Sequence, residues 1–143
     1  MLVITWSELK GVLRRLAAFL PVRPDAVVGV GRSGLIPAAI MCRYLGCQRF
    51  YAVFVEKYGE GKPPPLVHDE PLLVWGFAED LEGATTLIVD DVAVTGSTLS
   101  LVKEYVKRRN AGEVYTLVIV KKSGVDVDFY GLETDECVVF PWE

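Results

Sequence analysis

The feature that most constrains the fold is the stretch of residues 86–98, Thr-Leu-Ile-Val-Asp-Asp-Val-Ala-Val-Thr-Gly-Ser-Thr. It begins as a run of apolar and β-branched residues, which is typical of a buried strand, and the run stops at Asp90 and Asp91. A loop of small residues then leads into a segment with apolar residues at helical spacing. Strand, polar loop and helix are the repeating unit of a parallel α/β sheet. We therefore predict that the two acids stand where a buried strand ends, at the ligand-binding edge of such a sheet.

The rest of the chain repeats this alternation. Thr5 and Glu8 have the spacing of a capping box, and apolar residues follow at helical spacing until Pro21, which predicts a first helix. Apolar runs bounded by glycine and proline predict strands at 26–30, 50–55, 72–75 and 114–120, and helices at 35–45 and from 99 to about 112. The expected fold class is α/β, with an open, mostly parallel sheet flanked by helices.

Chain length, composition and charge limit the number of domains and the kinds of partner that the protein can have. With 143 residues, 51% hydrophobic and 24% charged, the chain suits a single domain 1–143, with a core of about 21–122. A small C-terminal hood of about 123–143 is expected to join the N-terminal segment. The net charge of −4 provides no basic footprint for nucleic acid, and no apolar run is long enough for a membrane, so we expect a cytoplasmic protein without either partner. The cysteines lack metal-ligand spacing and are expected to be free thiols: Cys42, Cys47 and Cys137.

The residue types of 90–98 suit one ligand chemistry. The adjacent carboxylates of Asp90 and Asp91 are able to accept hydrogen bonds from both hydroxyls of a vicinal diol, and also to hold a hydrated Mg²⁺ ion. Residues 95–98 offer successive backbone N–H groups, hydroxyls and a helix N-terminus, which together form an anion cradle. A diol beside a phosphate describes ribose 5-phosphate. The plainer alternative is an Asp-Asp turn followed by an ordinary Thr or Ser N-cap.

Residues 87–98 resemble the phosphoribosyl pyrophosphate (PRPP) signature of type I phosphoribosyltransferases, and the order of elements over about 26–120 resembles that family too. The ending 138–143 is similar to the tails of compact purine phosphoribosyltransferases of the xanthine-guanine and hypoxanthine kind. The resemblance implies transfer of phosphoribosyl from PRPP to a purine base, with release of pyrophosphate, in nucleotide salvage. It implies Mg²⁺ held by the two acids through water, and ribose-phosphate contacts from Asp90, Asp91, Ala93, Val94, Thr95, Gly96, Ser97 and Thr98.

By the same resemblance, the first glycine-rich loop binds the pyrophosphate through Gly31, Arg32, Ser33 and Gly34. The family often has a non-proline cis peptide at or just before this arginine. Arg32 is implied to be catalytic together with Asp90 and Asp91, because its charge steadies the leaving pyrophosphate.

The expected nucleobase contacts come from the last long strand and the tail: Lys121 or Lys122, Cys137 and Val138. Val94 stands where hypoxanthine- and xanthine-guanine-type relatives have an aspartate that exchanges a proton with the purine, which valine cannot do. Relatives that act on adenine have an apolar or small residue there, so adenine also fits. Cys137 stands near the usual position of a base-stacking aromatic ring. These departures favour a second hypothesis, a PRPP- or nucleotide-binding regulatory protein without turnover.

Other interpretations stay open. Residues 29–34 also match G-x-G-x-x-G, with Glu56 about the right distance beyond, which is typical of dinucleotide-binding proteins but leaves the loop at 90–98 unexplained. The glycine- and proline-rich residues 57–65 predict a long loop that is either a lid or an inert connection. His68 is expected to be an ordinary surface-loop histidine. The apolar tail favours a homodimer.

Overall fold

The computed structural model describes residues 1–57 and 65–143. In this part of the chain the elements follow in the order β1 (Leu2–Val3), α1 (Trp6–Phe19), β2 (Ala26–Gly31), α2 (Leu35–Tyr44), β3 (Arg49–Glu56), β4 (Leu72–Trp75), β5 (Thr86–Ala93), α3 (Ser97–Arg108), β6 (Val114–Lys121), β7 (Phe129–Glu133) and β8 (Val138–Val139). The predicted strands and helices are all present, with boundaries shifted by a few residues.

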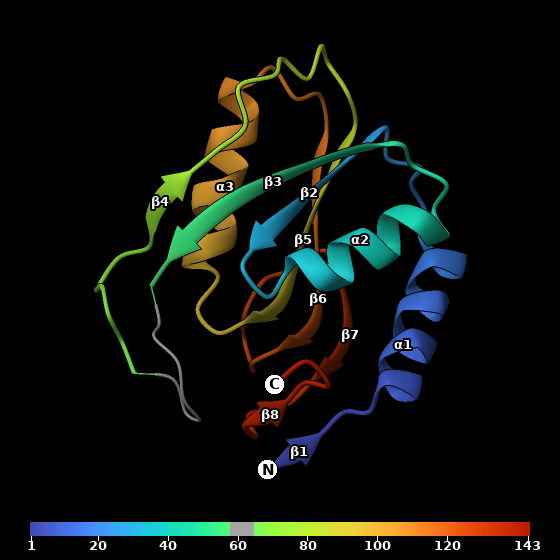
Figure 1. Ribbon diagram of the computed structural model, residues 1–143, viewed down its shortest axis with the longest axis vertical. Helices are drawn as coiled ribbons and strands as arrows, with labels where there is room; N and C mark the ends of the chain where they lie inside the picture. The colour runs from blue at the N-terminus through green and yellow to red at the C-terminus, as the bar shows by residue number, and fades with distance from the viewer. Residues whose placement is uncertain (58–64) are drawn as a thin grey trace.

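The main sheet has the strand order β4-β3-β2-β5-β6-β7, and a separate two-stranded sheet joins β1 to β8 (Figure 1). Only β4 runs antiparallel to its neighbour, whereas the other neighbouring pairs are parallel. The α/β fold with an open, mostly parallel sheet is therefore confirmed.

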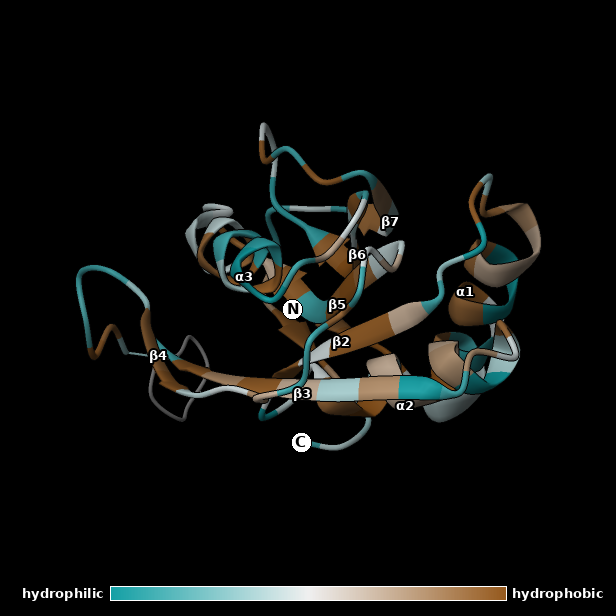
Figure 2. Ribbon diagram, turned by 90° about the horizontal axis from the view of Figure 1, so that it is seen from above, coloured by the Kyte–Doolittle hydropathy of each residue, from teal (hydrophilic) through white to brown (hydrophobic). Residues whose placement is uncertain are grey.

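Helices cover both faces of the sheet, as Figure 2 shows from above. Successive strand residues point to opposite faces, so neighbours such as Val27 and Val28 enter different cores. On one face, Val27 packs with residues of α1 and α2, including Leu13 and Met41. On the other face, Val28 packs with residues of α3, including Val102. The strands are apolar on both sides because both sides are covered.

Local signals define the helix ends. The capping box predicted for α1 is present: Thr5 Oγ1 accepts from Glu8 N at 3.1 Å, and the Glu8 carboxylate accepts from Thr5 N. The helix α3 begins after Gly96, whose φ of 89° lies in the left-handed region that glycine adopts without strain. Among the described residues, no helix has both the length and the apolar character needed to cross a membrane.

Two features differ from the predictions. Asp90 and Asp91 do not end their strand, because β5 continues to Ala93, which pairs with Lys121. The sequence also predicts a core that ends near residue 122, whereas β7 is the sixth strand of the main sheet.

The tail does not provide the exposed apolar surface on which the homodimer prediction depends. Phe140 is only 2% exposed, and its ring stacks on Trp142 with centroids 4.8 Å apart. Val138 is 5% exposed and pairs with Leu2 in the two-stranded sheet. The tail is therefore part of the core beneath α1.

Candidate active site

The predicted site residues gather at the carboxyl ends of β2 and β5, which are neighbours in the sheet. The chain leaves β2 through α2 toward β3 on one side, and leaves β5 through α3 toward β6 on the other. The two connections diverge, so this is the topological switch point of the sheet. Ligands of open α/β sheets bind at such points.

The two acids lie in different surroundings. Asp90 is 9% exposed, and its Oδ1 accepts a hydrogen bond from Asp91 N at 2.8 Å. Asp91 is half-buried, and its Oδ1 accepts from Val92 N at 2.8 Å. Burial, together with the neighbouring Asp91 carboxylate, raises the pKa of Asp90 well above its ordinary value. A cationic or hydroxyl-rich ligand would stabilise the ionised form of Asp90, which suits a binding role for the two acids.

The first glycine-rich loop touches the acids. A Cβ on Gly34 would lie 2.6 Å from Asp90 Oδ1 and 2.3 Å from Val30 O, so only glycine fits there. The peptide bond between Gly31 and Arg32 is cis, as expected. Gly31 is also confined, because a Cβ there would lie 2.7 Å from the Phe54 ring. Both predicted ligand loops thus belong to one continuous surface.

The loop before α3 carries hydroxyls that face one another. Thr95 Oγ1 and Ser97 Oγ are 2.9 Å apart, and Ser97 N donates to Thr95 Oγ1 at 3.3 Å. With Gly96 in the left-handed region and a helix N-terminus behind it, this loop has the groups of an anion site.

Lys57 is a site residue that the sequence analysis missed. It follows β3 directly, is only 9% exposed, and its Nζ donates to Ser97 Oγ at 2.7 Å and to Thr95 Oγ1 at 3.3 Å. A buried ammonium group beside two hydroxyls adds positive charge to the anion loop. The available signal was its place after a strand, at the same sheet edge as the acids.

The predicted base-binding lysines lie at one end of β6, and both ammonium groups already have protein partners. Lys121 Nζ donates to Val125 O at 2.8 Å, lies 3.5 Å from the Glu133 carboxylate and sits 4.8 Å from the centre of the Tyr130 ring. Lys122 Nζ donates to Glu136 O, beside Cys137. The loop after β6 is thereby tied to the tail.

Three predicted base-site residues differ in exposure. Val94 is 41% exposed and directly follows β5. Cys137 is partly buried, whereas the Val138 side chain belongs to the core, so only its backbone remains for a ligand. His68 is half-buried, and its Nε2 lies 2.8 Å from Glu56 Oε1. The predicted lid at 57–65 falls almost entirely outside the described residues.

The two acids suit one mode of metal binding. The described ranges 1–57 and 65–143 contain no group of three or more His, Cys, Asp or Glu side chains arranged to hold a metal. Mg²⁺ often binds through one or two carboxylates and completes its shell with water and phosphate oxygens. Asp90 and Asp91 fit that mode, because a divalent cation offsets both the burial of Asp90 and the repulsion from Asp91, which together raise the pKa of Asp90.

The chain is similar to phosphoribosyltransferases in sequence and in structure. The family described as "Phosphoribosyl transferase domain" matches residues 5–143. The chain is 32% identical to the xanthine-guanine phosphoribosyltransferase of Cereibacter sphaeroides, over 98% of this chain and 85% of that protein. It is 34% identical to the xanthine-guanine phosphoribosyltransferase of Gluconobacter oxydans, over 98% and 83%. The crystal structure of a purine phosphoribosyltransferase from Pyrococcus horikoshii superposes with a TM-score of 0.85 at 32% identity, covering 99% of this chain and 93% of that one.

The strand order and the loops at the switch point define an open-sheet α/β protein of the kind that binds ligands at that edge. The chain belongs to the phosphoribosyltransferase family. It is therefore a PRPP-dependent glycosyltransferase, and the resemblance stated from residues 87–98 is confirmed. The dinucleotide-binding interpretation of residues 29–34 is left without support.

Proposed function

We propose that the protein transfers the phosphoribosyl group of PRPP to a purine base in nucleotide salvage, and that the residues described above form its site. The observation that carries the proposal is the contact between the first loop and the paired acids, with the hydroxyl-rich loop next to them. One surface then offers groups for a pyrophosphate, a ribose diol and a 5-phosphate. The names of the relatives, which include xanthine-guanine and purine enzymes, favour a purine.

Each part of PRPP has a proposed partner. Asp90 and Asp91 accept hydrogen bonds from the two ribose hydroxyls. The loop of residues 93–98 donates backbone N–H groups and hydroxyls to the 5-phosphate. Residues 31–34 surround the pyrophosphate, where the exposed Arg32 contributes positive charge. When bound, Mg²⁺ supplies further positive charge to the pyrophosphate.

The reaction exchanges one bond at the anomeric carbon of the ribose. The bond to a pyrophosphate oxygen breaks, a bond to a purine ring nitrogen forms, and the base loses the proton of that nitrogen. Positive charge develops on the ribose as the bond breaks, so the Asp90–Asp91 pair stabilises the transition state electrostatically. Arg32 holds the leaving group at the other end of the breaking bond.

The base is proposed to lie between the end of β6 and the tail, near Lys121 or Lys122, Cys137 and the Val138 backbone. Hydrogen bonds between residues 122–123 and 135–136 support this placement. They hold the end of β6 and the tail together at the sheet edge beside Val94. Val94 neither accepts nor donates a proton, so the purine proton must leave through water or another group.

Calorimetry with PRPP and Mg²⁺, followed by adenine, hypoxanthine, guanine and xanthine with pyrophosphate release recorded, tests the proposal. We expect PRPP binding and release of pyrophosphate with at least one base. Binding without release for every base would favour the regulatory alternative that Val94 and Cys137 suggest. Asp91→Asn should abolish both signals, whereas Glu104→Gln, the same type of change on the exposed face of α3, should leave both intact.

A homodimer is proposed on a different surface from the tail. Leu72, Val74 and Trp75 of the edge strand β4 are each more than half exposed. An edge strand with exposed apolar side chains is suited to pairing with a second copy. Analytical ultracentrifugation should give a dimer mass that Trp75→Glu reduces to the monomer mass; an unchanged mass would rule out this surface.

A further inference from the structure

The end of α2 brings two cysteines together. Gly46 has a φ of 67°, its N–H donates to Arg43 O at 3.1 Å, and Cys47 N donates to Cys42 O at 2.9 Å. These two bonds form a Schellman motif, which closes many helices. In this motif the residue after the glycine contacts the residue three positions before the C-cap, which is Leu45 in α2. That contact is usually made by two apolar side chains. Here the two residues are Cys47 and Cys42.

The two thiols are direct neighbours. Cys42 Sγ lies 2.6 Å from Cys47 O, and both cysteines are free. Burial raises the pKa of Cys42 to about 11, and the neighbouring Cys47 thiol contributes to that rise. The backbone hydrogen bond between the two residues, together with the position of Cys42 Sγ against Cys47 O, places them within the reach of a disulfide.

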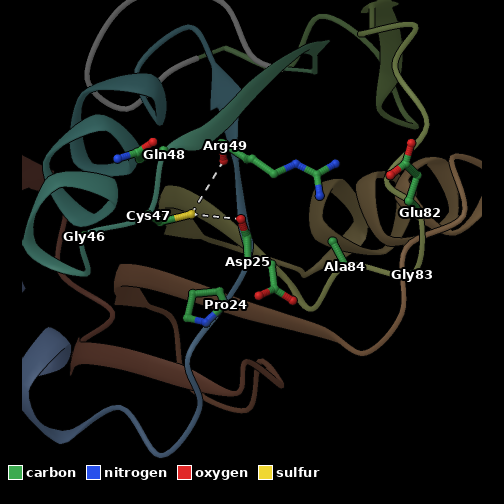
Figure 3. Close-up of a pocket in the computed structure, with 9 residues that line it drawn as sticks. All are labelled: Pro24, Asp25, Gly46, Cys47, Gln48, Arg49, Glu82, Gly83 and Ala84. Carbon is green, nitrogen blue, oxygen red and sulfur yellow. Dashed lines mark hydrogen bonds between the residues drawn. The ribbon is translucent and has the colours of Figure 1, made fainter.

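Cys47 is the more accessible of the two cysteines. Cys47 lines a surface hollow of about 510 Å³ at the amino ends of the strands, with Asp25, Arg49 and Glu82 (Figure 3). Its Sγ lies 3.2 Å from Asp25 O and 3.7 Å from Arg49 O. Cys42 is only 8% exposed behind it. The hollow lies at the opposite edge of the sheet from Asp90, so it does not belong to the proposed phosphoribosyl site.

We propose that Cys42 and Cys47 form a site of reversible oxidation, which a low-molecular-weight disulfide converts into an intramolecular disulfide. The Cys47 thiolate attacks the reagent, forms a mixed disulfide and releases one thiol. The Cys42 thiolate then attacks Cys47 Sγ, forms the Cys42–Cys47 bond and releases the second thiol. The protein loses two protons and two electrons, and the reagent disulfide is reduced to two thiols. The order follows from exposure, because Cys47 faces the hollow and Cys42 does not.

The test uses the whole protein equilibrated in glutathione mixtures of increasing oxidised fraction. After acid quenching, free thiols are alkylated in denaturant and counted by mass spectrometry with peptide mapping. We expect Cys42 and Cys47 to lose alkylation together as a linked peptide, while Cys137 stays alkylated as an internal reference. The proposal is overturned if both remain alkylated in oxidised glutathione, if Cys47 retains glutathione that Cys42 does not displace, or if the bridge involves Cys137.

Matched variants assign the two steps. Cys42→Ser should trap glutathione on Cys47, because the second thiol is missing, whereas Cys137→Ser should form the bridge as the natural chain does. The bridge should also raise Tm by roughly 5 °C in the natural chain and in Cys137→Ser, since it constrains the unfolded chain. An equal Tm in oxidised and reduced samples of the natural chain, with no linked peptide, would contradict the proposal independently of activity.

Discussion

Lys57 Nζ lies 2.7 Å from Ser97 Oγ, although the two residues are 40 positions apart in the chain. The contact places the buried ammonium group of Lys57, which follows β3, against the residues where α3 begins. A phosphate at this loop would therefore meet an ammonium group as well as hydroxyls and backbone N–H groups.

Lys57→Met should raise the KM for PRPP about 10- to 100-fold with a smaller change in kcat, because a charge-assisted hydrogen bond contributes about 1.5–3 kcal/mol. Steady-state kinetics at saturating base measures both constants. Lys107→Met, on the exposed face of α3, is the control and should match the natural protein. An unchanged KM in Lys57→Met would mean that the lysine only fills space.

Asp90→Asn should stabilise the free protein at neutral pH while abolishing transfer. The pKa of Asp90 is raised in the folded state, so ionising it costs folding free energy, about 1.4 kcal/mol for each pKa unit. The natural protein is favoured while Asp90 is protonated and loses that contribution as pH rises through the raised pKa. Its Tm should thus fall relative to the variant as pH rises from about 4, the ordinary pKa of an aspartate, through the raised pKa of Asp90. Parallel Tm curves across that range would contradict the prediction.

The same raised pKa predicts how PRPP binding depends on pH. The ionised Asp90 carboxylate accepts hydrogen bonds through both oxygens, whereas protonation turns one oxygen into a donor and weakens the other as an acceptor. Calorimetric affinity for PRPP should therefore weaken as pH falls through the raised pKa of Asp90, beyond the change due to the phosphates themselves. Inorganic pyrophosphate, which lacks the diol, serves as the reference ligand for the titration of the phosphates alone. An equal pH dependence for the two ligands would contradict the prediction.

Gly34→Ala should reduce kcat/KM by at least about 100-fold, because its Cβ would press against Asp90 Oδ1 and Val30 O and displace the acid. Gly11→Ala is the matched control in α1, where a Cβ meets nothing within 4 Å. It should raise the free energy of unfolding by about 0.5–1 kcal/mol and leave activity unchanged. Equal activity of the two variants would show that the first loop tolerates the displacement.

Val94→Asp should raise kcat for 6-oxopurines about 10-fold or more, because it places an acid/base group at an exposed position beside the proposed base site. Asparagine has the shape of aspartate but no ionisable group, so Val94→Asn should not reproduce the gain in kcat. A gain in both variants would indicate an effect of polarity instead of proton transfer.

Local patterns account for what the sequence predicted well. The acids, the small-residue loop and the start of the helix all lie within residues 86–98. Because they follow one another in the chain, they are also neighbours in space. The capping box of α1 and the glycine after α2 are similarly local. Such features depend on residues that are neighbours in the chain, and a sequence shows those neighbours directly.

Long-range contacts account for what was missed. Lys57 joins the site only because β3 lies beside β2 in the sheet. Strand β7 joins the main sheet through β6, although its residues have no strong apolar run of their own. The sequence predicts an exposed tail, whereas in the structure α1 and the pairing of β1 with β8 bury it. Each of these outcomes is decided by tertiary packing that no local pattern contains.

The close approach of Gly34 to Asp90 has an evolutionary consequence. Because a single methyl group at Gly34 would collide with the carboxylate, the two loops cannot diverge independently. A graft that brings any other residue to position 34 would create this clash. Substitutions meant to change the purine preference should therefore be made at Val94 and in the tail, which leave the approach of Gly34 to Asp90 intact.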